Sequence, residues 1–286
     1  MNKKEIKALV SLLDDEDHTI VHHVEEKIIS LGNKIIPHLE TEWESSFNPT
    51  IQRKLEDIIH TLQFDQLKGR LLEWKGKGAR DLLKGMWLIA TYQYPDIEFK
   101  NLREEIEQIY HEAWRAFRDD IHPYDQVKIL NSVLYSNYKF RANTKNFHSP
   151  ANSMINEVLN SKKGNPISLC VIYILIARKL KMPVHGVNLP NLFICTYKTQ
   201  QIQFYINAFN RGLLFSKADL ENYIASLQIN PLDIFYEPCG NLDIIKRVLR
   251  NLIVSYEKLG DHYKVNEVKI LLNEISAGDD DSSGVL

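Results

Sequence analysis

The sequence predicts an α+β fold that is mostly helical, with a small antiparallel sheet in the middle of the chain. Apolar residues recur at helical spacing near both ends. The segment Ile167–Leu180 is apolar on nearly all sides, which is typical of a buried central helix. Residues Gln201–Ala208 alternate between apolar and polar, which is typical of a strand. Helices are therefore expected on both sides of a central part that carries the sheet.

Two similar helical segments stand near the N-terminus. His18–Leu31 aligns with Pro49–Leu62, and the spacing of Ile20, Val24 and Ile28 predicts one apolar face. The pattern resembles HEAT-type helical pairs, whose apolar faces need stacking neighbours. Two unrelated amphipathic helices would give the same pattern, so both interpretations stay open.

A glycine-containing stretch, Gly69–Gly78, follows these helices. It lacks the spacing of a phosphate-binding loop and is expected to be a flexible connector. Residues 1–80 are therefore predicted to be a separate, HEAT-like helical region, and residues 81–237 a central domain.

The central helix has a well-marked start. Asn165 is a good N-cap, Pro166 suits the first helical position, and Met182–Pro183 ends the helix. The other elements expected in this part are helices at Asp81–Tyr92, Asn101–Phe117 and Tyr124–Tyr135, a surface loop at Arg141–Pro150, strands at Asn191–Tyr197 and Gln201–Ala208, and a helix opened by a capping box from Ser216 to Asp219.

The C-terminal part is again helical. Leu242–Leu259 ends at Gly260, and a second helix is expected at Lys264–Ile275. A helix, a glycine turn and a helix resemble a tetratricopeptide-like pair, here residues 238–276. The acidic tail, residues 277–286, is expected to be disordered.

The composition favours an ordinary cytoplasmic globular protein. Of its 286 residues, 44% are hydrophobic and 25% charged, with a formal net charge of −2. No strong positive field would attract nucleic acid or an anionic membrane, and neither a signal peptide nor a transmembrane helix is expected. The odd cysteine count favours a reducing compartment. His18 and His22 have metal-compatible spacing but no third ligand, so neither a metal nor a cofactor is expected.

The three cysteines are weak candidates for catalysis. A thiol nucleophile of the papain type needs the start of a helix, where the dipole lowers its pKa, but Pro166 occupies that position. Cys170 lies one turn deeper and should be a buried core residue. Cys195 lies within a strand, and Cys239 follows a proline in a loop that is expected to be exposed.

The segment Asn152–Tyr197 resembles the signature of the SirB-type branch of the transglutaminase-like superfamily, and the resemblance extends over about residues 85–276. The matching positions are Asn152, Ser153, Val158, Leu159, Gly164, Pro166, Ile167, Ser168, Leu169, Tyr173, Ala177, Arg178, Leu180, Pro183, Gly186, Val187, Pro190 and Phe193. The resemblance implies a transglutaminase-like, papain-like central domain with an appended helical repeat.

The resemblance also implies where a catalytic triad would lie. The Cys, His and Asp positions fall on Pro166, Leu192 and Asn207, which are expected to converge without any catalytic residue among them. The degenerate cleft would be lined by Asn165, Ser168, Asn191, Asn210 and Arg211. Arg211 would contact a partner carboxylate, or else be a solvated loop charge.

Three functions remain open from the sequence. The first is a non-catalytic interaction or regulatory module that binds a protein or peptide, and neither nucleic acid nor membrane. The second is a cryptic cysteine hydrolase or acyltransferase that uses Cys170 or Cys195. In the third, the cleft is filled and has no activity. The sequence favours the first and indicates no particular oligomeric state.

Overall fold

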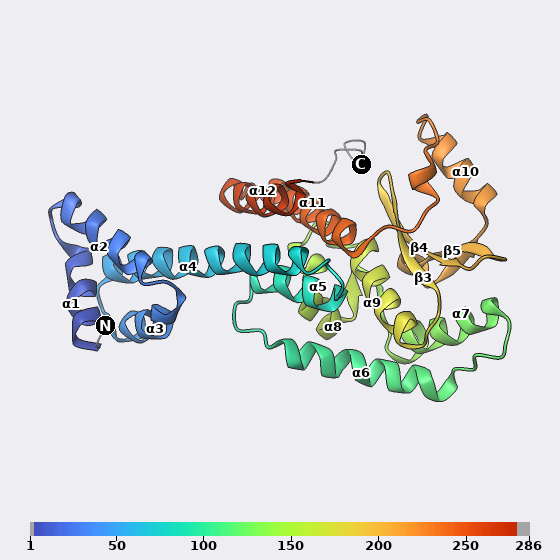
Figure 1. Ribbon diagram of the computed structural model, residues 1–286, viewed down its shortest axis with the longest axis horizontal. Helices are drawn as coiled ribbons and strands as arrows, with labels where there is room; N and C mark the ends of the chain where they lie inside the picture. Colours follow the sequence, from blue (N-terminus) through green and yellow to red (C-terminus); the bar gives the residue numbers. More distant parts are fainter. Residues whose placement is uncertain (1–2, 279–286) are drawn as a thin grey trace. The chain divides into compact units, whose positions relative to one another are not determined.

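The computed structural model describes residues 3–278 (Figure 1). It is mostly helical with a small antiparallel sheet, as predicted. By internal contacts the chain divides into two units that meet at Arg70 and Leu71, and each is described by itself. No helix within the described range has the length and apolar character that crossing a membrane requires.

The first unit is built from four helical segments: α1 (Lys3–Ser11), α2 (His18–Ser30), α3 (Ile36–Ser45) and the N-terminal part of α4 (Pro49–Gly76). Its core gathers apolar residues from all four, among them Ile6, Val24, Ile28, Leu39, Leu55 and Leu62. Val24 and Ile28 of α2 are buried, as predicted. The expectation for Ile20 is wrong: it is 40% exposed, and Val21 is the third buried residue of this face. The HEAT-like character of this unit stays a prediction.

Helix α4 runs through most of the stretch that was expected to be a flexible connector. Gly69 and Gly76 lie within the helix, which ends only at Gly76. A glycine costs roughly 1 kcal/mol in a helix interior. Leu67, Leu71 and Trp74 are buried at helical spacing along the same stretch, and the burial of these large side chains outweighs that cost.

The short segment after α4 is held in place. The indole nitrogen of Trp74 donates to the carbonyl of Asp81 at 2.8 Å. The Asn241 amide donates to the carbonyls of Ala79 and Arg80 at 2.9 and 3.0 Å. Residues 79–81, which directly follow the expected connector, are therefore hydrogen-bonded to α4 and to the first residue of α11.

The second unit surrounds one buried helix. Its helices are α5 (Leu82–Thr91), α6 (Phe99–Ala116), α7 (Pro123–Asn131), α8 (Ile155–Ser161), α9 (Pro166–Lys179), α10 (Lys217–Ser226), α11 (Asn241–Leu259) and α12 (His262–Ser276). Helix α7 continues as a π-helical turn, η3 (Ser132–Asn137), and a short turn, η5 (Ala208–Asn210), follows the third strand of the sheet. As predicted, α9 is central: it packs against the sheet, α5, α6, α8 and α11 (Figure 1).

The sheet has four antiparallel strands in sequential order: β3 (Val184–Leu189), β4 (Leu192–Lys198), β5 (Gln203–Asn207) and β6 (Leu213–Phe215). Of these strands, only β4 and β5 were predicted. Gly186 and Asn188 interrupt the apolar pattern of β3, and the three residues of β6 are too few to show a pattern. Two further residue pairs, β1 (Arg141–Ala142) and β2 (Lys163–Gly164), form a small parallel ladder beside the expected loop.

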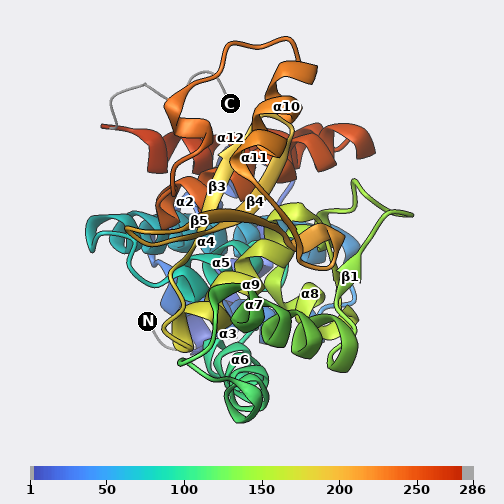
Figure 2. The ribbon, with the colours of Figure 1, turned by 90° about the vertical axis from the view of Figure 1, so that its right-hand side faces the viewer.

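The two faces of the sheet pack on different helices (Figure 2). The Cys195 thiol points at α9, where it lies 3.8 Å from the carbonyl of Cys170. On the other face, Ile194 and Tyr205 pack with Leu220 of α10. Side chains alternate along a strand, so neighbours in sequence belong to different faces.

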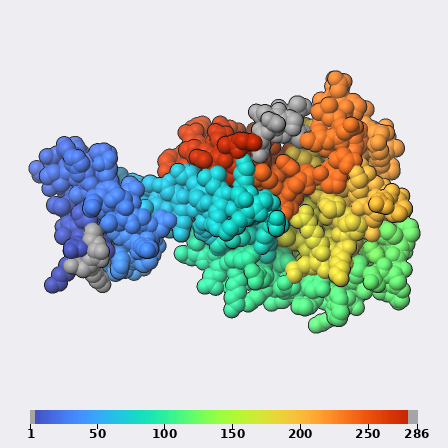
Figure 3. All heavy atoms as spheres, in the orientation of Figure 1, coloured from blue at the N-terminus to red at the C-terminus, as the bar shows by residue number. Residues whose placement is uncertain are grey.

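The C-terminal helical pair is present as predicted. Helix α11 ends at Gly260, whose φ of 74° gives the left-handed cap that favours glycine. Helix α11 packs directly on α5 and α9, and α12 packs on α11; the space-filling view shows the pair continuous with the rest of this unit (Figure 3). Its tetratricopeptide-like character stays a prediction. The tail expected at residues 277–286 lies outside the described residues, apart from Ala277 and Gly278.

The hydrogen bonds of Asn241 predict how the segment after α4, residues 79–81, responds to protease. Trypsin should cut slowly after Arg80 in the wild-type protein, because Asn241 holds that carbonyl and its neighbour. Asn241→Ala should expose the site and increase the rate of this cut several-fold. Limited proteolysis with mass mapping measures it, with Asn222→Ala on the exposed face of α10 as control. Equal rates in all three proteins would contradict the assigned role.

Candidate functional site

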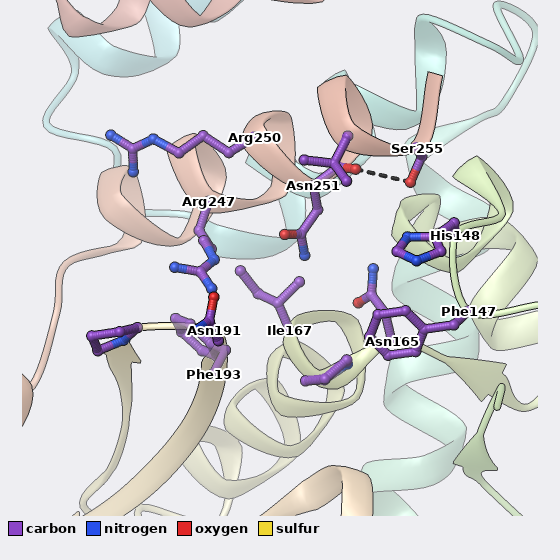
Figure 4. A pocket seen from close by; sticks show the side chains of 13 residues that line it. Phe147, His148, Asn165, Ile167, Asn191, Phe193, Arg247, Arg250, Asn251 and Ser255 are labelled. Carbon is purple, nitrogen blue, oxygen red and sulfur yellow. Dashed lines mark hydrogen bonds between the residues drawn. The ribbon is translucent and has the colours of Figure 1, made fainter. Parts of the chain in front are cut away.

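A pocket of about 380 Å³ opens at the start of α9 (Figure 4). Four segments form its wall: the loop before α8, the first residues of α9, the β3–β4 turn and one face of α11. The lining residues are Phe147, His148, Asn165, Pro166, Ile167, Pro190, Asn191, Phe193, Arg247, Arg250, Asn251, Val254 and Ser255. We call this the Arg247 pocket.

The floor of the Arg247 pocket is a buried capping box. The Asn165 side-chain oxygen accepts from the backbone N–H of Ser168 at 2.9 Å, and the Ser168 hydroxyl accepts from the N–H of Asn165 at 3.1 Å. The Asn165 amide also donates to the hydroxyl of Ser153 at 2.9 Å. A Cβ on Gly164 would lie 2.4 Å from the Ser168 oxygen, so only glycine fits there.

This geometry corrects the expected position of Ser168. Its side chain is fully buried and belongs to the capping box, so it does not lie at the rim of a cleft. Asn165 and Pro166 do reach the pocket, as Asn191 does from the turn.

The β3–β4 turn supplies the second wall. Leu189 pairs with Leu192, which leaves Pro190 and Asn191 as the turn residues. Asn191 has a φ of 59°, a left-handed conformation that asparagine tolerates better than most residues. The Tyr223 hydroxyl donates to the carbonyl of Pro190 at 3.0 Å and so anchors the turn to α10.

Helix α11 supplies the cationic wall. In Figure 4, Arg247 points from α11 toward the β3–β4 turn, and Asn251 points toward the start of α9. One nitrogen of Arg247 donates to the Asn188 side-chain oxygen at 3.1 Å and to the Leu189 carbonyl at 3.3 Å. Burial, then the proximity of Arg250, lowers the pKa of Arg247 from its usual value. Over residues 3–278, neither arginine has a carboxylate partner.

These α11 residues were not among the residues predicted for the site. Residues Leu242–Leu259 were expected only to form the first helix of a tetratricopeptide-like pair. A usable signal was present, because Arg247, Asn251 and Ser255 recur every four residues and must share a face.

The three expected triad positions do not line one pocket. Pro166 lines the Arg247 pocket, whereas Leu192 and Asn207 line a separate hollow that also includes Asp219 and Tyr223. Leu192 packs on the α10 face of the sheet, opposite α9. Successive side chains of a strand point to opposite faces of the sheet. The two residues that flank Leu192 in the sequence, Asn191 and Phe193, therefore reach the Arg247 pocket, whereas Leu192 does not. The assignment of these positions to a lost triad stays a prediction.

The remaining expected residues, Asn210 and Arg211, lie on the loop beyond β5, as predicted, but line a third pocket. It has a volume of about 450 Å³ and is lined by Tyr135, Lys139, Phe140, Arg141, Ala142, Phe209, Asn210 and Arg211. We call it the Arg211 pocket. The Arg211 side chain is exposed, and its backbone has a left-handed conformation with a φ of 52°.

None of the three thiols lines the Arg247 pocket. Cys170 is fully buried, as predicted, and Cys195 is buried beside it, where burial and then a hydrogen bond with Cys170 raise the pKa of Cys195 well above its usual value. Cys239 is partly buried rather than exposed, because its backbone N–H pairs with Gly186 at 2.8 Å. Burial raises the pKa of Cys239 to about 12.

No group of His, Cys, Asp or Glu side chains in the described part of the chain has an arrangement that could hold a metal ion. The one imidazole at the Arg247 pocket is that of His148, whose ring packs edge-on to Phe147 with centroids 5.2 Å apart.

Comparison with known proteins gives a family and several relatives. Residues 100–250, more than half of the chain, match the model described as the transglutaminase-like superfamily. A "UPF0162 protein" of Xylella fastidiosa (strain 9a5c) is 29% identical over 61% of this chain and 64% of its own length. "UPF0162 protein YchA" of Escherichia coli (strain K12) is 22% identical over 61% of this chain and 66% of its own.

A third relative is "F-box only protein 21" of Mus musculus, which is 25% identical over 67% of this chain but only 34% of its own length. The chain thus spans less than two thirds of the length of the Xylella relative and about a third of the mouse protein. No solved structure matches this chain.

The buried capping box predicts a stability difference. Asn165→Ala removes a helix cap and leaves the Ser153 hydroxyl without its donor in a buried place, so the free energy of unfolding should fall by about 2–3 kcal/mol. Ser216→Ala, in the exposed capping box of α10, should cost about 1 kcal/mol. Urea unfolding of both variants and the wild type gives the comparison. An equal loss of unfolding free energy in Asn165→Ala and Ser216→Ala would show that burial of the capping box adds nothing to its contribution.

Proposed function

We propose that this chain, which belongs to the transglutaminase-like superfamily, is a non-catalytic, peptide-binding interaction or regulatory module of the SirB-type branch, working in the cytoplasm. The observation that supports this most is Pro166. The position where chemistry of this kind needs a nucleophile at a helix start carries a side chain without one, yet a pocket is open there.

The other lining residues supply no activated nucleophile. Ser255 carries the one hydroxyl among them, and it donates to the carbonyl of Asn251 at 2.8 Å rather than to an imidazole. A general base has to lie within hydrogen-bond reach of the group it activates. The arrangement therefore favours binding over bond cleavage.

The chemistry of the pocket suits a peptide. Amide side chains of Asn191 and Asn251 can donate to and accept from a peptide backbone, whereas Ile167 and Val254 offer apolar surface. A mixture of apolar wall and a few convergent polar groups is usual for ligand sites. No observation favours the cryptic hydrolase, because Cys170 and Cys195 are fully buried.

Thiol reactivity tests the non-catalytic part of the proposal. All three cysteines should react with iodoacetamide far more slowly than glutathione near neutral pH, because burial or a raised pKa keeps them as inaccessible thiols. Since the pKa of Cys239 is raised to about 12, its labelling should increase only as the pH rises toward that value. Intact-mass measurement follows the reaction, with urea-unfolded protein as control. One thiol that reacts rapidly near neutral pH would revive the hydrolase.

A pocket-filling substitution tests the binding part. Val254 is 43% exposed on α11 and lines the Arg247 pocket, so Val254→Trp should fill the pocket without disturbing the core. Proteins captured from native cytoplasm by the wild type should be lost with this variant. Ile270→Trp on α12, at 44% exposure, is the matched control and should retain them. Identical capture by Val254→Trp and the wild type would place the binding surface elsewhere.

A further inference from the structure

The Arg247 pocket and the Arg211 pocket share an uncompensated positive charge. Arg247 and Arg250 line the first, and Lys139, Arg141 and Arg211 line the second, whereas no Asp or Glu lines either. None of these five cations forms an ion pair within residues 3–278. The whole chain has a net charge of −2, so this is a local concentration of positive charge.

An aromatic pair joins the two pockets. Phe147 lines the Arg247 pocket and Phe209 lines the Arg211 pocket. Their rings meet edge to face, with centroids 6.1 Å apart and an interplanar angle of 88°. Phe147 is 44% exposed, so the junction is open to an occupant. The linings of the two pockets therefore meet at this apolar contact.

We propose that the two pockets form one site for an acidic peptide: one carboxylate binds at Arg247 and Arg250, a second binds at Arg211 and Arg141, and the peptide backbone crosses the Phe147–Phe209 pair. This rests on the proposed function and names the chemistry of the partner. Guanidinium groups suit it because their planar fork pairs with both oxygens of a carboxylate.

The helix start of α9 is not what attracts the anion. Asn165 already accepts from the N–H of Ser168, and Pro166 has no N–H, so this end offers few free donors. The attraction comes from the five cationic side chains, three of which are exposed.

A peptide fits better than a nucleic acid. Both pockets are concave, with volumes of about 380 and 450 Å³, rather than a ridge that follows a phosphate backbone. Amide side chains, Asn191 and Asn251 in one pocket and Asn210 in the other, match the donors and acceptors of a peptide backbone. Binding of nucleic acid is therefore one of the outcomes that the experiment distinguishes.

The experiment measures fluorescence anisotropy of three labelled probes on the full chain at low ionic strength. The probes are an oligo-glutamate peptide, the matched oligo-glutamine peptide and an oligo-uridine RNA of the same net charge as the first. The variants are Arg250→Gln and Arg211→Gln, singly and together. Within residues 3–278 neither side chain forms a hydrogen bond or an ion pair, in contrast to Arg247, which bonds the β3–β4 hairpin. Arg53→Gln, an exposed arginine outside both pockets, is the matched control.

The oligo-glutamate peptide should bind at least tenfold more tightly than the oligo-glutamine peptide. Each single variant should weaken binding by about tenfold and the double variant by about a hundredfold, since one charge-assisted contact is lost at each end. Arg53→Gln should leave the affinity within about twofold. A loss of affinity in both single variants requires that one peptide spans both pockets.

Three results would overturn the proposal: equal affinity for the two peptides, no loss in Arg250→Gln or in Arg211→Gln, or tighter binding of the RNA with the same variants affected. The outcome is separable from the proposed function. If Val254→Trp loses its captured partners but the acidic peptide does not bind, the module binds peptides of another chemistry.

Discussion

The buried capping box at Asn165 and Ser168 is the constraint on which the rest of the second unit depends. It fixes the residue at which α9 begins, and α9 is the helix on which the sheet, α6 and α11 all pack. The Ser168 hydroxyl fills the space that a Cβ at residue 164 would occupy, so only glycine allows the backbone to pass this close to it. A helix that began one residue earlier or later would turn different side chains toward the sheet, and the pocket at its start would have another wall.

The elements that the sequence predicted are those whose signals are local. The Asn-Pro pair marks the start of α9, and Gly260 marks the end of α11, because a cap is a property of a few adjacent residues. Helix α4 shows the limit of this reasoning. Gly69 indicates a break by propensity alone, but tertiary burial of Leu71 and Trp74 decides the outcome, and burial is not visible in a window of sequence.

The site was predictable in part for the same reason. Asn165, Pro166 and Asn191 are close to marked element ends, and they reach the pocket. The face on which Leu192 lies depends on strand register, which a single residue reverses. The arginines of α11 lie far along the chain, and only the packing of α11 over the start of α9 brings them to the pocket. The four-residue spacing of Arg247, Asn251 and Ser255 indicates that they share a face, but not which part of the chain that face packs against.

The hydrogen bonds of Arg247 have a mechanical consequence. A guanidinium carries several N–H donors, and here one nitrogen serves both Asn188 and Leu189, which fastens the hairpin to α11. Arg247 also lines the Arg247 pocket. Arg247 thus both links the β3–β4 hairpin to α11 and forms part of the wall of the pocket. A ligand that bound the guanidinium of Arg247 would compete with the hydrogen bonds to Asn188 and Leu189, and would so weaken the link between the β3–β4 hairpin and α11.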